Sequence, residues 1–377
     1  MVGRSLLVVL LVALAVGSVA AAQLGYVDRL RGRIKGPTPK PLSVGDFPAG
    51  VMAPIDDVVK VPTRPLVLGV VPRGSVAPLV LAAGDNERVG LFRAAYAIDV
   101  KLVSFSREEE LRKALVRGGE NGGVDVAVLP VSSLAMSASL LRDAAPRVVL
   151  LVGRSRGQEV VAARAGQSTI AALARKKVGV EPRSASWYLL LWTLSRGGLT
   201  LRDVELVPMD SAFNASEQLR AGKVDAVAGE AGDVRPVVQE LGGTVLSTTG
   251  DAPHLIADVL VARGDFAARY PDGIRRLLRG VLDSNQVVLK DPGEAARALG
   301  TFAPQLGDPT EAIAAAPPST LKDNLAFFGL GDESPVTFHE LFSSAASLNT
   351  KLFEAPVAPS PDDLVDLSGL KYISTTR

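Results

Sequence analysis

Between Leu201 and Glu230 the chain reads LRDVELVPMDSAFNASEQLRAGKVDAVAGE, and this segment decides the fold class. Its apolar runs predict one strand at Val204 to Val207 and a second at Ala226 to Ala228. Between them, apolar side chains three and four residues apart predict a helix over Ala215 to Ala221, which Gly222 ends. The order strand, helix, strand is that of an α/β fold.

The same unit occurs a second time, from Glu110 to Leu129. There a helical pattern is followed by GGVDVAVL, just as the helix that begins near Glu217 is followed by GKVDAVA. This repetition favours two similar α/β lobes. The alternative is a helix-to-strand turn shared by chance, because short turn motifs recur widely.

Strand and helix patterns alternate through most of the chain. After Val259 to Ala262 the pattern becomes mainly helical, and from Pro356 onward the sequence is rich in Pro and Asp. Further strands are predicted at Leu66 to Val71, Val100 to Phe105, Val124 to Leu129, Val148 to Val152, Val178 to Val180 and Val245 to Leu246, and further helices at Glu108 to Arg117, Ser186 to Ser195, Val234 to Leu241, Gly273 to Leu289, Pro292 to Phe302 and Pro335 to Leu352.

The composition excludes several classes of function. Lys and Arg total 41 and Asp and Glu total 40, so no global charge attracts nucleic acid or an anionic membrane. The absence of cysteine excludes disulfides, thiolate catalysis and cysteine zinc sites. His254 and His339 are the only histidines and lie far apart in the sequence. We therefore expect no metal site, no cofactor and no enzymatic activity.

The first 22 residues have the pattern of a secretory signal peptide. Arg4 precedes the apolar run Ser5 to Val16, and the small residues Ala20 to Ala22 follow. The alternative is an uncleaved membrane anchor, because Leu6 to Val27 has about the length that spans a bilayer. The small-residue site favours export to the periplasm, either as a soluble or as a membrane-tethered protein. Residues 23–65 are rich in Pro and Gly, which is typical of an extended linker.

Several stretches, taken in order, are similar to one family. Together with the Leu201 to Glu230 segment, they resemble the periplasmic solute-binding proteins of the nitrate, sulfonate, taurine and thiamine-precursor ABC importers. The resemblance covers Leu66 to Phe302. Its other stretches are Leu68 to Gly84, Gly123 to Ser133, Leu150 to Ala163, Ser247 to Tyr270 and Ile274 to Leu289.

The resemblance implies a two-lobed α/β protein with the type II periplasmic-binding fold. Lobe one would combine residues 66–153 with 250–303, lobe two would comprise residues 154–249, and residues 304–377 would form a helical C-terminal extension and tail. It also implies a small-molecule ligand in the cleft between the lobes and an ABC transporter permease as partner.

In an open α/β sheet, ligands bind at the carboxyl ends of the strands. In lobe one these ends predict two ligand-binding loops, one at Arg73, Gly74 and Ser75 and the other at Ser132 and Ser133. Glycine permits close backbone approach and serine offers a hydroxyl. Ordinary turn formation and helix capping are the alternatives.

In lobe two the best candidate anion site is the helix start at Ser184 and Ser186, because serine hydroxyls and free amides gather there. Helix capping is again the alternative. Asp210 with Ser211, and Glu230, would complete the cleft. Many members of the family carry an aromatic residue directly before this glutamate, where the chain has Gly229, and this departure puts the identity of the ligand in doubt.

Two further candidates lie near the predicted hinge. The guanidinium of Arg154, with that of Arg156, would suit a sulfonate, phosphonate or carboxylate. An ion pair with Glu159 is the alternative. His254 would donate a hydrogen bond into the cleft, unless the backbone satisfies it.

Together these features predict the substrate-binding component of an ABC importer that captures a small anionic solute such as a sulfonate, taurine or nitrate. The alternative is a membrane-tethered ligand sensor or scaffold with the same fold, which the Pro-rich linker would suit.

Overall fold

The structure is a computed structural model that describes residues 60–85, 89–353 and 356–376. The predicted signal peptide or anchor, residues 1–22, and the predicted linker as far as residue 59 lie outside the described residues. Among the helices of the described ranges, none is both long and apolar enough to cross a membrane.

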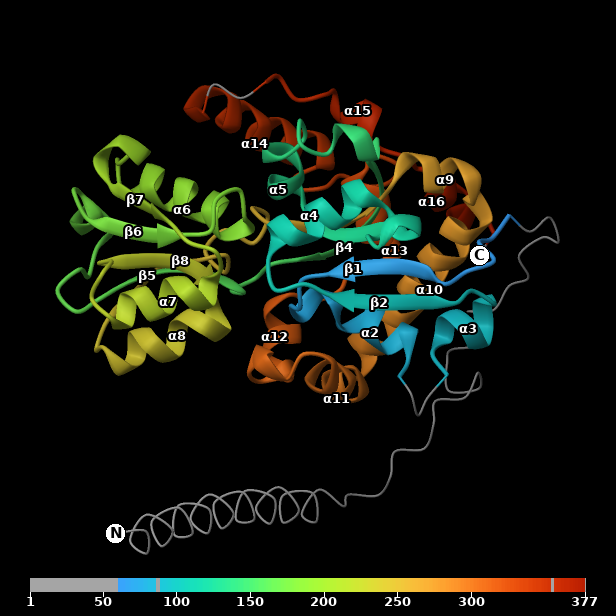
Figure 1. Cartoon of the computed structure of the whole chain (residues 1–377), viewed down its shortest axis with the longest axis horizontal. Coiled ribbons are helices and arrows are strands. Elements are labelled where there is room, and N and C mark those ends of the chain that lie inside the picture. Colours follow the sequence, from blue (N-terminus) through green and yellow to red (C-terminus); the bar gives the residue numbers. More distant parts are fainter. Residues whose placement is uncertain (1–59, 86–88, 354–355, 377) are drawn as a thin grey trace, which may run out of the picture. The chain divides into compact units, whose positions relative to one another are not determined.

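Two five-stranded sheets form the framework (Figure 1). We call the part built on the sheet β2-β1-β3-β10-β4 lobe one, and the part built on the sheet β7-β6-β8-β5-β9 lobe two. The strands of lobe one are β1 (Leu66–Val70), β2 (Val100–Ser104), β3 (Val126–Pro130), β4 (Arg147–Arg154) and β10 (Ala257–Ala262). Those of lobe two are β5 (Glu159–Ala163), β6 (Lys177–Val180), β7 (Glu205–Pro208), β8 (Ala226–Glu230) and β9 (Thr244–Thr248).

The two sheets have matching topologies. In lobe one, β1 pairs in parallel with β2 and β3, and β10 runs antiparallel between β3 and β4. In lobe two, β6 pairs in parallel with β7 and β8, and β5 runs antiparallel between β8 and β9. The strands of the repeated sequence unit are β3 and β8, which occupy equivalent places. The predicted two-lobed α/β fold is therefore confirmed.

Helices cover both faces of each sheet. In lobe two, α6 lies on one face and α7 and α8 on the other (Figure 1). This arrangement explains the continuous apolar strand sequences, because a strand covered on both faces exposes neither row of side chains. The helices up to β10 are α2 (Ala77–Ala83), α3 (Leu91–Tyr96), α4 (Glu108–Arg117), α5 (Val131–Met136), α6 (Ala185–Arg196), α7 (Ala212–Arg220) and α8 (Ala231–Glu240).

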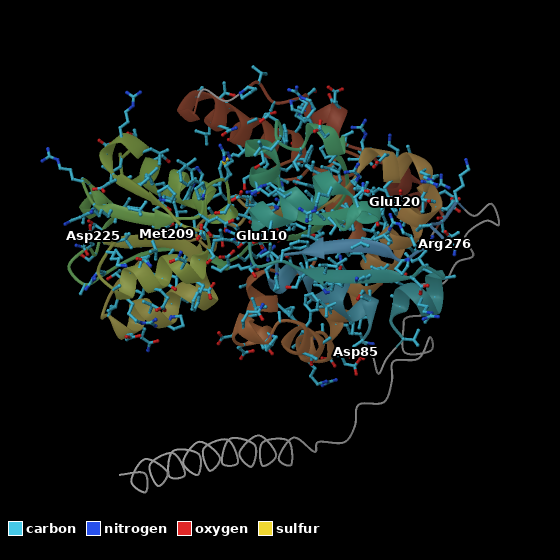
Figure 2. All side chains as sticks on the ribbon, viewed as in Figure 1. Asp85, Glu110, Glu120, Met209, Asp225 and Arg276 are labelled. Atoms are coloured by element: carbon cyan, nitrogen blue, oxygen red, sulfur yellow. The ribbon has the colours of Figure 1, made fainter. Side chains whose placement is uncertain are left out.

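The carboxyl ends of the parallel strands in both sheets face the other lobe. Asp225, directly before β8, lies at the far end of lobe two, whereas Met209, directly after β7, lies near lobe one (Figure 2). In lobe one, Glu120 precedes β3 at the far end, and Glu110 on α4 lies toward lobe two (Figure 2). Two segments connect the lobes, residues 155–158 from β4 to β5 and residues 249–256 from β9 to β10.

The chain after β10 is helical and packs on lobe one. The side chain of Asn324 bonds to both backbone groups of Leu151 on the edge strand β4, at 2.7 and 3.0 Å. The Pro- and Asp-rich tail folds back as well, since Leu370 and Ile373 are buried. The helices of this part are α9 (Gly264–Arg269), α10 (Pro271–Lys290), α11 (Gly293–Phe302), α12 (Pro309–Ala315), α13 (Leu321–Phe327), α14 (Phe338–Phe353), α15 (Pro361–Leu364) and α16 (Ser368–Thr375).

Candidate functional site

A pocket of about 670 Å³ lies where the two lobes meet. We call it the interlobe pocket. Half of its lining residues come from α4 and the chain after α5 in lobe one, and half from the end of β7 and the loops after β6 and β7 in lobe two. The lining residues are Glu109, Arg112, Lys113, Val116, Arg117 and Leu140 of lobe one, and Glu181, Pro182, Arg183, Pro208, Met209 and Asp210 of lobe two.

Arg73, the first predicted site residue, occupies the centre of a buried ion-pair cluster beside this pocket. Its Nη2 lies 3.0 Å from Glu108 Oε1 and 3.8 Å from Glu230 Oε1. Its Nη1 lies 3.3 Å from Asp258 Oδ1 and 3.8 Å from Glu159 Oε1. Because Glu108 and Asp258 belong to lobe one and Glu159 and Glu230 to lobe two, this guanidinium connects the lobes.

Burial sets the charge state of this cluster. Burial opposes the charge on Arg73, but the carboxylates of Asp258, Glu108, Glu230 and Glu159 together raise its pKa above the ordinary arginine value. The same burial raises the pKa of Glu159 to about 7 and also raises those of Asp258 and Glu230. Part of the carboxylate charge is therefore neutralised by protons at neutral pH.

Glu159 is held at the hinge by hydroxyl groups of the two connecting segments. Ser155 Oγ donates to Glu159 Oε2, and Thr249 Oγ1 lies 2.6 Å from Ser155 Oγ. Thr249 Oγ1 also accepts the amide of Gly157 at 2.8 Å. Since Ser155 and Thr249 come from different connecting segments, the carboxyl group of Glu159 couples the two crossings.

The predicted loop residues Gly74 and Ser75 contact other parts of the chain and do not line the interlobe pocket. Ser75 Oγ donates to Asp258 Oδ2 at 2.6 Å. A Cβ added at Gly74 would lie 1.8 Å from the carbonyl oxygen of Ala312, in α12. Gly74 therefore permits close approach of a backbone, and the group that approaches is the C-terminal extension.

Arg112 connects this cluster to the interlobe pocket. It is buried, lines the pocket, and donates through Nη1 to Ser133 Oγ at 2.7 Å and to Glu108 Oε2 at 3.4 Å. The predicted Ser133 thus positions a pocket arginine. Ser132 is also buried, and its hydroxyl has no hydrogen-bond partner among the described residues.

Glu181 faces Arg112 from the opposite wall of the pocket. Its Oε1 is buried and has no hydrogen-bond partner within the described part of the chain. Burial, reinforced by the charges of Glu108 and Glu230, raises the pKa of Glu181 to about 9. At neutral pH the group is therefore a neutral carboxylic acid, which donates a hydrogen bond.

Of the predicted residues of lobe two, Ser184 and Ser211 cap helices, whereas Asp210 lines the interlobe pocket. Ser184 Oγ accepts the amide of Trp187 at 3.1 Å, so it caps α6, and Ser186 is buried in the first turn. Ser211 Oγ caps α7 in the same way, accepting the amide of Asn214 at 3.1 Å. Asp210 lines the pocket, and its side chain is 76% exposed.

The backbone at Gly229 leaves no room for a larger side chain, which the sequence comparison with an aromatic residue at this place had left open. A Cβ added there would lie 2.8 Å from Ala212 Cβ and 2.9 Å from Val234 Cγ2. The next residue, Glu230, forms an ion pair with Arg73 at 3.8 Å.

Arg154 and His254 lie outside the interlobe pocket. Arg154 Nη2 donates to the carbonyl of Val336 at 3.1 Å, and its guanidinium lies 4.7 Å from the centre of the Phe327 ring. Burial lowers the pKa of Arg154. His254 lines a second pocket of about 530 Å³.

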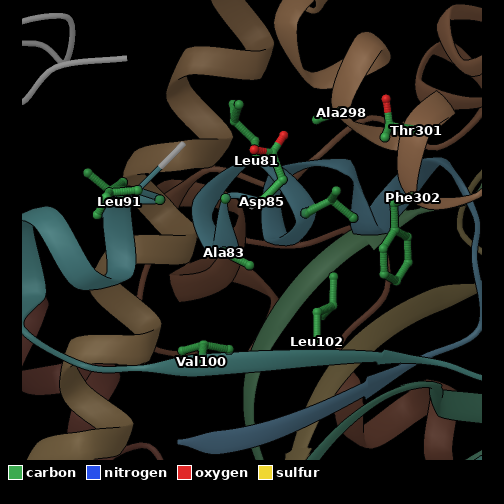
Figure 3. A pocket seen from close by; sticks show the side chains of 13 residues that line it. Leu81, Ala83, Asp85, Leu91, Val100, Leu102, Ala298, Thr301 and Phe302 are labelled. Carbon is green, nitrogen blue, oxygen red and sulfur yellow. The ribbon is translucent and has the colours of Figure 1, made fainter. Parts of the chain in front are cut away.

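A third pocket, of about 270 Å³, lies within lobe one between α2, β2 and α11 (Figure 3). Leu81, Leu91, Leu102 and Phe302 make its walls largely apolar. Among the described residues, its lining contains no residue of lobe two.

The sequence predictions missed five charged residues of the site: Glu108, Arg112, Glu159, Glu181 and Asp258. A signal was present for two of them. Glu159 opens the buried strand EVVAA, and Asp258 stands inside the buried strand ADVLVA. Acidic residues are almost never fully buried unless they are paired, so an acid in such a strand indicates a buried partner.

Comparisons with known proteins give a family match and several solved structures with a similar fold. A model of the NMT1-like family matches residues 59–302, which is more than half of the chain. A comparison with curated protein sequences gives no match. Among solved structures, the periplasmic aliphatic sulphonate-binding protein SsuA from Escherichia coli superimposes with a TM-score of 0.63 at 19% identity, covering 81% of this chain and 92% of that chain.

Two other structures are similar at lower scores. The periplasmic nitrate-binding protein NrtA from Synechocystis PCC 6803 has a TM-score of 0.55 at 15% identity, covering 78% of this chain and 91% of that chain. The desulfurization enzyme DSZB has a TM-score of 0.55 at 16% identity, covering 83% of this chain and 100% of that chain. At such identities the likeness shows the fold alone. The chain belongs to the NMT1-like family and has the two-lobed fold of the periplasmic solute-binding proteins.

Proposed function

We propose that this protein is the substrate-binding component of an ABC importer and captures a small anionic solute in the interlobe pocket. The observation that carries the proposal is the pocket itself, because its lining comes equally from the two lobes. A solute bound there stabilises the closed arrangement, which is how two-lobed proteins close on their ligands. A permease that recognises the closed form would then receive the solute on the periplasmic side.

The charges of the pocket favour an anion. Arg117 and Arg183 are exposed on opposite walls and form no salt bridge with a described residue, whereas Lys113 is paired with Glu109. Arg112 adds a third guanidinium at the inner end. Guanidinium groups bind the oxygens of sulfonates, carboxylates and nitrate with paired hydrogen bonds.

Glu181 does not oppose such a solute, although it carries a carboxyl group. Because its pKa is raised to about 9, the group is protonated at neutral pH and presents a hydroxyl donor. An anion that accepts this hydrogen bond would hold the proton on Glu181 more tightly still. The exposed guanidinium groups of Arg117 and Arg183, together with a protonated Glu181, support an anionic solute.

The proposal is tested by native mass spectrometry of the protein purified from its own periplasm. Leu140 lines the pocket and is 59% exposed, so Leu140→Trp fills the pocket without disturbing the core. Leu289 is 47% exposed and lies outside the pocket, and Leu289→Trp is therefore the matched control. We expect a small anionic compound to copurify with the wild type and the control but not with Leu140→Trp. Equal retention by all three proteins would contradict the proposal.

A further inference from the structure

The second pocket, of about 530 Å³, lies between lobe two and the C-terminal extension. We call it the extension pocket. Tyr188 and Trp192 on α6 form one wall, Asp251 and His254 of the connecting segment 249–256 form another, and Glu340 on α14 forms the third. Residues after 302 lie outside the range that the family model matches, so this part of the pocket is a feature of the chain beyond the family match.

The two carboxylates of the extension pocket each retain a free oxygen. Asp251 Oδ2 accepts the amide of Thr248 at 2.8 Å, and Glu340 Oε2 accepts the amide of Thr337 at 2.8 Å. Within the described residues, Asp251 Oδ1 and Glu340 Oε1 accept no hydrogen bond, and neither carboxylate has a salt bridge. Each of these two lining residues thus has one carboxylate oxygen that can accept a hydrogen bond from a ligand.

The lining of the extension pocket, as far as the structure describes it, contains no arginine or lysine. His254 is the only basic residue in the lining, and burial, aided by the nearby charges of Arg154 and Arg156, lowers its pKa below the ordinary value. The imidazole is therefore neutral at neutral pH, and its Nδ1 is buried without a hydrogen-bond partner among the described atoms.

The aromatic wall suits the uncharged part of a ligand. The Trp192 ring already holds one cation, the guanidinium of Arg196, at 5.0 Å from the ring centre. Tyr188 directs its hydroxyl to Ser344 Oγ on α14 at 3.1 Å, which leaves its ring as a side wall. Aromatic faces attract both apolar groups and cations.

We propose that the extension pocket binds a small organic cation, an ammonium or guanidinium group on an apolar body. The cationic group lies between the carboxylates of Asp251 and Glu340, and the apolar body packs against Tyr188 and Trp192. His254 Nδ1 accepts a hydrogen bond from the same cationic group. This site differs in position and in charge from the interlobe pocket.

The test uses phenylguanidinium as the probe and phenylurea as its neutral isostere, each titrated by calorimetry into the full chain at neutral pH. We expect saturable binding of phenylguanidinium at one site, and binding of phenylurea weaker by about tenfold or more, because the isostere lacks the charge. No saturable binding of phenylguanidinium, or equal binding of the two probes, would overturn the proposal.

Three variants locate the bound probe. Glu340→Gln and Asp251→Asn keep an oxygen that accepts the existing backbone hydrogen bond, so both should fold, and each should weaken phenylguanidinium binding about three- to tenfold. Glu333→Gln removes an exposed carboxylate outside the pocket and should leave binding unchanged. Binding that survives both pocket substitutions, or that is lost equally in Glu333→Gln, would refute the assignment to the extension pocket.

A last arm separates this site from the interlobe pocket. Arg117→Gln combined with Arg183→Gln changes only the interlobe pocket, and phenylguanidinium should bind this double variant as it binds the wild type. If the double variant changes phenylguanidinium binding while Glu340→Gln does not, the probe occupies the interlobe pocket and the proposal fails.

Discussion

Arg73 Nη2 lies 3.0 Å from Glu108 Oε1, and both side chains are only 3% exposed. This pair joins the turn after β1 to the first turn of α4. The same guanidinium also forms ion pairs with Glu159 and Glu230 of lobe two. An intrachain cation therefore occupies the centre of the interlobe contact.

We expect Arg73→Met to destabilise the protein by about 3–5 kcal/mol, because it leaves buried carboxylates without their cation. The measurement is urea unfolding at pH 7. Arg93 is the matched control, since its side chain is 73% exposed and its ion pair with Asp99 is on the surface. Arg93→Met should change the free energy of unfolding by less than about 1 kcal/mol. A loss below about 1 kcal/mol for Arg73→Met would show that the cluster does not hold the lobes.

The stability of the protein should fall as the pH rises from 5 to 9. In the folded state the pKa of Glu159 is raised to about 7 and that of Glu181 to about 9. At a pH between the pKa of the unfolded chain and these raised pKa values, the folded state therefore binds more protons than the unfolded state. The stability that proton binding to these two carboxyl groups contributes is fully present below their unfolded-state pKa. It is lost as the pH rises through their folded-state pKa values. Urea unfolding at pH 5, 7 and 9 measures it, and the expected decrease is on the order of a few kcal/mol.

The variant Glu181→Gln tests how much of this pH dependence comes from the carboxyl group of Glu181. The amide does not titrate, so the variant should lose less stability than the wild type between pH 7 and pH 9. Glu333→Gln, on an exposed loop, should follow the wild-type curve. Identical curves for wild type and Glu181→Gln would contradict the raised pKa of this carboxyl group.

Ser184→Ala should cost about 1 kcal/mol of stability, because it removes the side-chain oxygen that accepts the Trp187 amide at the start of α6. Ser195, near the end of the same helix, is exposed and bonds only to the local carbonyl of Trp192. Ser195→Ala should therefore change stability by less than about 0.5 kcal/mol. Thermal unfolding of both variants makes the comparison, and equal losses would contradict the capping role.

Asn324→Leu should weaken the attachment of the C-terminal extension to lobe one. The substitution leaves both the amide and the carbonyl of Leu151 unpaired in a buried position, at a cost of at least about 2 kcal/mol. Hydrogen exchange of the Leu151 amide measures the effect directly, and its protection should fall relative to wild type. Asn121→Leu, at an exposed turn, should leave this protection unchanged.

Local sequence patterns predicted many elements of the fold, although the strand β5 was not among them. The strand predicted at Val204 to Val207 is β7, the helix predicted at Ala215 to Ala221 is α7, and the strand predicted at Ala226 to Ala228 is β8, each within a few residues. Burial periodicity and glycine stops act over a few residues, so a single sequence contains this information.

The arrangement of the site could not be predicted in the same way. The loops of Arg73 and Glu230 were expected at the cleft, but the partners of Arg73 are not local, since Asp258 follows it by 185 residues. Glu108 has the sequence context of an ordinary acidic helix start, and nothing in that context indicates its burial or its ion pair with Arg73. Ser184 was predicted with both a capping and a binding interpretation, and no local pattern distinguishes the two.

The most direct test of the central claim is calorimetric titration with small anions, namely methanesulfonate, taurine and nitrate, into wild type and the Arg117→Gln/Arg183→Gln double variant. Arg142→Gln/Arg202→Gln is the matched control, because it removes one exposed arginine from each lobe outside the interlobe pocket. We predict that at least one anion binds wild type and the control equally, and binds the double variant at least about tenfold more weakly. Unchanged affinity in the double variant would contradict an anion site between the lobes.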